Sequence, residues 1–196
     1  FLPRPPQMPP LAAEYRHLPD VQPGHESPEF RLAIRQMVAR REITLNLMGE
    51  IGETVPEFRL SAHLREVPAE VGRRLREATR IPAEAQLGWA SEWEAWREWR
   101  AAIENLGVLV FQFVGVSLAE ARGLSLLRMP MPVAAINGKE IPEVKSFTLL
   151  HEVAHLMLAT GNEESSAARE KRTGDAWMDV ERFAESVAGH ALLPEQ

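Results

Sequence analysis

The sequence contains no cysteine among its 196 residues. This absence excludes disulfide bonds, a thiolate nucleophile and every zinc or iron–sulfur centre that cysteine would hold. Any metal ion bound by this chain must therefore be held by histidine nitrogens and carboxylate oxygens.

Positive charge and long apolar runs are also scarce. Lys and Arg number 22 against 28 Asp and Glu, which gives a formal net charge of −6, and no basic cluster is present that would grip nucleic-acid phosphates. No apolar run approaches the roughly 18 residues of a membrane-spanning helix, and the first residues lack the apolar core of a signal peptide. We therefore expect a cytoplasmic protein that touches no membrane and whose present segment does not bind nucleic acid directly.

Proline density and apolar spacing divide the chain into three parts. Eight of the 15 prolines fall within residues 1–28, a density that predicts an extended linker. Because the sequence begins with Phe1 rather than methionine, we expect a further domain upstream of this linker. Residues 29–81 have the apolar spacing of a helical region, and residues 82–196 combine strands with helices.

Local patterns predict an α+β fold with one small antiparallel sheet. Four tryptophans recur on one face of the third predicted helix, which favours a core stripe over a binding platform. The strand over 132–137 is expected at an edge of the sheet, because a proline at its start cannot join a central ladder. Helices are predicted over 29–52, 67–79, 82–106, 142–159 and 175–193, and strands over 108–114, 123–127 and 132–137.

The strongest chemical signal is an H-E-x-x-H motif, formed by His151, Glu152 and His155 in the helix predicted over 142–159. Residues four apart project from the same side of a helix, so both imidazoles can reach one metal ion while Glu152 approaches a water molecule there. The flanking residues are apolar, and burying these three side chains without partners would cost on the order of several kcal/mol. The motif predicts a metal centre; the alternative is a buried helix whose histidines only form hydrogen bonds.

A catalytic zinc site takes three protein ligands and leaves one position open. Without cysteine, the third ligand must be a His, Asp or Glu on another element. Glu181 stands far enough along the chain for a loop and a returning helix, and its neighbours are small or apolar, as close helix packing requires. The other candidates on the last helix are Asp175, Asp179, Glu185 and His190.

These segments resemble the ImmA/IrrE family of bacterial and phage metallopeptidases. The family signature F-T-L-x-H-E-x-x-H matches the chain from Phe147 to His155, and its later E-x-x-A-N-x-F-A-x-x-L-L-M-P matches in part from Glu181 onward. Among the positions that depart from it, Glu185 replaces the asparagine and Val187 the phenylalanine. The resemblance covers roughly residues 85–196 and implies a zincin-like domain over 82–196, in which a small sheet packs on the H-E-x-x-H helix and on a second ligand-bearing helix.

The resemblance also implies roles for individual residues. His151, His155 and Glu181 would bind Zn²⁺, with Mn²⁺ as an alternative, and Glu152 would act as general base. Glu185 is a candidate to orient a ligating histidine, the alternative being a solvated side chain. No residue is assigned to stabilise the oxyanion.

The implied activity is hydrolysis of a peptide bond in a protein substrate, typically a helix-turn-helix transcriptional repressor that controls stress-response, prophage or mobile-element genes. We expect the substrate to bind as an added strand along 132–137. One alternative is a regulatory module that sequesters a repressor without cutting it and whose metal site is structural or vestigial. Another is a DNA-binding regulator that acts through an upstream helix-turn-helix domain.

Overall fold

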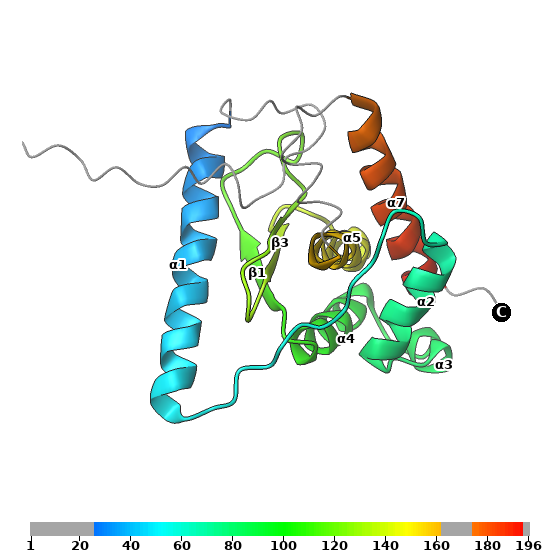
Figure 1. The fold of residues 1–196 in the computed structure, drawn as a ribbon, viewed down its shortest axis with the longest axis horizontal. Coiled ribbons are helices and arrows are strands. Elements are labelled where there is room, and N and C mark those ends of the chain that lie inside the picture. Colours follow the sequence, from blue (N-terminus) through cyan, green and yellow to red (C-terminus); the bar gives the residue numbers. More distant parts are fainter. Residues whose placement is uncertain (1–25, 162–173, 194–196) are drawn as a thin grey trace, which may run out of the picture.

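The computed structural model describes residues 26–161 and 174–193, and its architecture is α+β. Figure 1 shows α1 on one side of the sheet and α5 on the other, with α7 and α2 farther out on the α5 side. None of the described helices is both long and apolar enough to cross a membrane. The elements are α1 (Pro28–Ile51), α2 (Pro68–Thr79), α3 (Ala83–Leu87), α4 (Glu92–Asn105), β1 (Leu109–Phe113), β2 (Gly123–Leu126), β3 (Val133–Asn137), α5 (Pro142–Thr160) and α7 (Gly174–Leu192).

The first helix, α1, begins and ends where the sequence predicts. The Ser27 hydroxyl accepts a hydrogen bond from the Phe30 N–H at 3.0 Å, and Pro28 occupies the first helical position. Gly52 ends the helix with a φ of 73°, a left-handed conformation that favours glycine. The predicted linker over 1–28 lies outside the described residues as far as residue 25.

The single helix predicted over 82–106 is wrong, because the chain forms α3 and α4 with a break between them. Gly88 ends α3, and the Ser91 hydroxyl starts α4 by accepting a hydrogen bond from the Glu94 N–H at 3.3 Å. Within α4, the Trp93 side chain is 52% exposed, whereas Trp96 and Trp99 are buried. The predicted stripe of four core tryptophans is therefore only partly correct.

The sheet is mixed rather than antiparallel. Its strand order is β1-β3-β2, with β1 parallel and β2 antiparallel to β3. The expectation that 132–137 forms an edge is also wrong, because β3 is central and all its residues are buried. Pro132 is tolerated because it stands just before β3, where its carbonyl accepts a hydrogen bond from the Leu109 N–H at 2.8 Å. β1 and β2 take the edge positions instead.

Each face of the sheet has its own apolar cluster. The first helix packs Phe30, Ile34 and Met37 onto one face. The opposite face packs on α5, and the core continues from there to α4, α7 and α2. The helices of residues 29–81 thus pack directly on elements of residues 82–196, α1 on the sheet and α2 on α7.

Candidate metal centre

The H-E-x-x-H motif lies in the middle of α5, the helix that covers one face of the sheet. Pro142 occupies the first turn, where its missing N–H leaves no hydrogen bond unmade. The helix is buried on nearly every side from Thr148 to Leu158, as its apolar sequence predicts. Within this segment His155 is 0% exposed, and the His151 ring lies one turn away with its centroid 4.6 Å from that of His155.

The two histidines and Glu181 converge on one point. The Nε2 atoms of His151 and His155 are 3.0 Å apart, and Glu181 Oε2 lies 3.2 Å from the first and 4.0 Å from the second. Ligand atoms about 2.1 Å from a tetrahedral Zn²⁺ lie about 3.4 Å apart, so the three observed separations bracket the required value. Two imidazoles and a carboxylate are also a donor set that zinc accepts. The residues therefore fit a metal ion, and the structure confirms that the chain brings together a group able to hold one.

Glu181 reaches this point because α7 packs closely on its neighbours. Ala184, Val187 and Ala188 are fully buried in the cluster that α7 shares with α5, as the sequence predicts. At the far end of α7, the Arg76 guanidinium of α2 donates hydrogen bonds to the carbonyls of Ala191 at 2.8 Å and Leu192 at 3.3 Å. This anchor satisfies carbonyls that a helix end otherwise leaves unpaired, and so fixes α7 relative to α2.

A buried lysine connects the first turns of α5 to its surroundings. Lys145 is buried and donates a hydrogen bond to Gln112 Oε1 of β1 at 2.7 Å. Its ammonium also lies 5.2 Å from the ring centroid of Trp93 and 5.8 Å from that of Trp96, both on α4. Burial lowers the pKa of this lysine, while the charge of Glu140 acts in the opposite direction. Lys145 thus ties the metal-site helix to both the sheet and α4.

Glu152 is the other polar residue of the motif and is only 6% exposed. Its side chain lies against Gly123, the first residue of β2. The sequence did not single out Gly123, because a glycine at the start of a predicted strand has the pattern of an ordinary turn residue. Its proximity to Glu152 depends on the packing of α5 against β2, which local patterns do not encode.

The structure does not bring every candidate of the last helix to the site. Glu185 is exposed, and within the described residues no hydrogen bond or ion pair joins it to either histidine. Asp179 is exposed and pairs with Arg182 at 3.4 Å. The Cβ of His190 packs near Gly72 of α2, and the side chain of Asp175 lies outside the described residues. Among the residues whose side chains the structure describes, Glu181 is thus the carboxylate that joins the two histidines.

No family model, curated protein or solved structure with which the chain was compared matches it.

Proposed function

We propose that this chain is a zinc-dependent endopeptidase that hydrolyses a peptide bond in a protein substrate. The observation that carries the proposal is the convergence of one ligand atom each from His151, His155 and Glu181, with Glu152 buried on the same turn of α5. Three ligands with an adjacent carboxylate are the donor set of catalytic zinc sites, which keep one position open.

His151, His155 and Glu181 would hold the ion, and Glu152 would act on the proton. A bound Zn²⁺ supplies Lewis acidity and lowers the pKa of water toward neutrality. Glu152 would accept a proton from the attacking water and later donate it to the leaving amine, as a general base and then a general acid.

The substrate would bind along β2 rather than along β3. Adding a strand requires an edge, and β2 is the edge strand that adjoins Glu152 through Gly123. A peptide paired with β2 would therefore carry its backbone past the general base. Residues Leu124 to Leu126 are buried, so recognition along this edge would rely on backbone hydrogen bonds more than on side chains of β2.

The family proposed for this activity is ImmA/IrrE, on the signature residues around His151 and Glu181. We propose a helix-turn-helix transcriptional repressor as the substrate, since this is what the resemblance implies. A module that binds such a repressor without cutting it is the competing function.

The test combines metal analysis with cleavage of a candidate repressor. Glu152→Gln should keep the metal content of the unchanged chain and lose cleavage by at least about a hundredfold, because only the proton acceptor is removed. Glu185→Gln serves as a matched control and should retain both, since this glutamate is exposed. Undiminished cleavage by Glu152→Gln would contradict the proposal, and binding of the repressor without cleavage by the unchanged chain would favour the competing function.

A further inference from the structure

We propose that Gly123 is a positioning residue for Glu152, because the missing side chain on the first residue of β2 leaves the space that the carboxylate occupies. The role of Glu152 in this inference rests on the proposed function. The contact itself does not.

The packing leaves no room for a larger residue. A Cβ added to Gly123 would lie 2.8 Å from Cγ and 2.9 Å from Cδ of Glu152, and would meet Oε1 as well. These separations are shorter than the closest approaches that Cβ atoms normally make, so the carboxyl group would have to move. Glu152 is 6% exposed, and its neighbours Val153 and Leu149 are fully buried, so it has little free space to enter.

Backbone conformation does not explain the glycine. Gly52, Gly107 and Gly115 have positive φ angles, whereas Gly123 does not. It pairs with Ile136 of the central strand, a position where strand propensity favours a branched or aromatic residue. Glycine weakens a strand and often marks a close approach of another group. The close approach here is the Glu152 side chain.

Gly123 lies against the proposed general base and not against the proposed metal ligands. Among the atoms that a Cβ at Gly123 would approach most closely, all three belong to Glu152 and none to His151, His155 or Glu181. Gly123→Ala should therefore displace the carboxylate while the ligand set keeps its affinity for metal. The result would be a protein that binds metal normally but catalyses slowly.

The first experiment measures the contact without metal or substrate. Thermal unfolding is followed in EDTA for the unchanged chain, Gly123→Ala, Glu152→Ala and the double variant. Overpacking should make Gly123→Ala lower the unfolding midpoint by about 5 °C. In the Glu152→Ala background the same substitution should change the midpoint by less than about 1 °C, because the obstructing group is gone. An equal decrease of the unfolding midpoint in both backgrounds would contradict the proposed steric contact between residue 123 and Glu152.

The second experiment measures the consequence for catalysis, with Zn²⁺-loaded protein and fluorescein-labelled casein as the probe. Gly123→Ala should lower kcat by about tenfold or more, with KM within about twofold and the metal content unchanged. Gly189→Ala is the control, because a Cβ there meets nothing within 4 Å.

The outcomes distinguish the two ideas. If Gly123→Ala cleaves casein at the rate of the unchanged chain, the positioning role is overturned. If the unchanged chain cleaves neither casein nor the candidate repressor but the unfolding midpoints are coupled, the contact stands and the proposed function is contradicted.

Discussion

The two faces of the sheet differ in what they bury. The cluster under α1 consists of apolar side chains such as Phe30, Met37 and Leu124. The opposite face, under α5, buries Glu152 and His155 within its apolar cluster. Polar groups inside a core are costly unless they are paired or hold a ligand, and the α5 face is the one that carries the group able to hold a metal ion.

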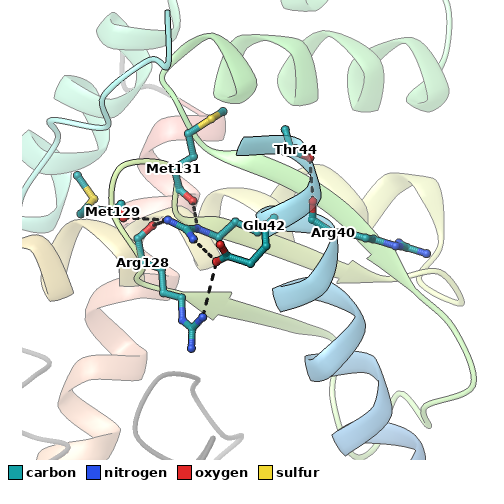
Figure 2. Close-up of polar contacts among 7 residues, drawn as sticks. Arg40, Glu42, Thr44, Arg128, Met129 and Met131 are labelled. Carbon is teal, nitrogen blue, oxygen red and sulfur yellow. Dashed lines mark hydrogen bonds and ion pairs between the residues drawn. The ribbon is translucent and has the colours of Figure 1, made fainter. Parts of the chain in front are cut away.

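The α1 face also has a buried charge, but at its rim. Arg41 of α1 donates hydrogen bonds to the carbonyls of Arg128 at 2.9 Å, Met129 at 2.8 Å and Met131 at 2.8 Å. Figure 2 shows these carbonyls gathered beside the helix. Here a single guanidinium donates to three separate carbonyls, which fixes a loop in place. At the metal centre, by contrast, three groups are directed at a single point, the arrangement expected of a binding site.

Arg41→Ala should have the largest effect on stability. The substitution leaves three carbonyls without their donor, so we expect the free energy of unfolding to fall by about 3–5 kcal/mol. Urea denaturation measures this loss, and metal content should not change, because α1 lies across the sheet from the site. Arg40→Ala is the control, since that exposed side chain makes one hydrogen bond, to the Gln112 carbonyl at 3.3 Å. A loss of metal binding in Arg41→Ala would show that the two faces are not independent.

His155→Ala should remove the stabilisation that a bound metal ion gives to the unchanged chain. At a Zn²⁺ concentration about 100 times the dissociation constant, metal should stabilise the unchanged chain by about 2.7 kcal/mol, and this gain should disappear in the variant. Thermal unfolding with and without Zn²⁺ measures the difference. Equal stabilisation of both proteins would contradict a metal centre at this position.

Gly72→Ala should disturb the packing that places α7. A Cβ at Gly72 would lie 2.7 Å from the His190 Cβ and 2.8 Å from the Val187 carbonyl oxygen, so α2 and α7 would be forced apart. We expect a loss of about 2 kcal/mol in the free energy of unfolding, together with weaker metal binding through Glu181. Gly49→Ala is the control and should show neither effect, because a Cβ added there meets nothing within 4 Å.

The smallest effect concerns Glu66, in the segment that connects α1 with α2. A hydrogen bond from Arg74 at 2.9 Å holds the pKa of this carboxyl below its usual value, although partial burial acts in the other direction. Because the folded-state pKa is the lower one, the pair stabilises the protein above the unfolded pKa of 4.5, and this contribution is lost as the pH falls through the folded value. Both side chains are partly exposed, so Glu66→Gln should cost less than about 1 kcal/mol at pH 7. Urea denaturation at pH 7 and pH 3 should show that the free energy of unfolding depends less on pH in Glu66→Gln than in the unchanged chain.

Features that depend on helical spacing could be predicted from the sequence. The four-residue spacing of His151 and His155 required only that α5 be a helix, and the apolar spacing of residues 29–52 predicted the extent of α1. The sheet could not be predicted in the same way, because alternation along a strand gives its faces but not its neighbours. Gly123 was missed for the same reason, since its meaning comes from a helix distant in the sequence. Trp93 shares α4 with Trp96 and Trp99, and its exposure depends on which side of that helix the rest of the molecule covers, which spacing alone does not give.

The position of β3 has a consequence for how the chain acquires its structure. Of the described strands it is the last in sequence but the middle one in space, and β1 and β2 are each paired only with it in that sheet. β1 and β2 therefore cannot assemble into this sheet until the chain has been synthesised as far as residue 137. A chain that ends before Val133 would lack β3, so β1 would have no strand to pair with and the apolar face of α1 would lose part of the surface on which it packs. Such a chain should aggregate or be degraded rather than fold into a smaller domain.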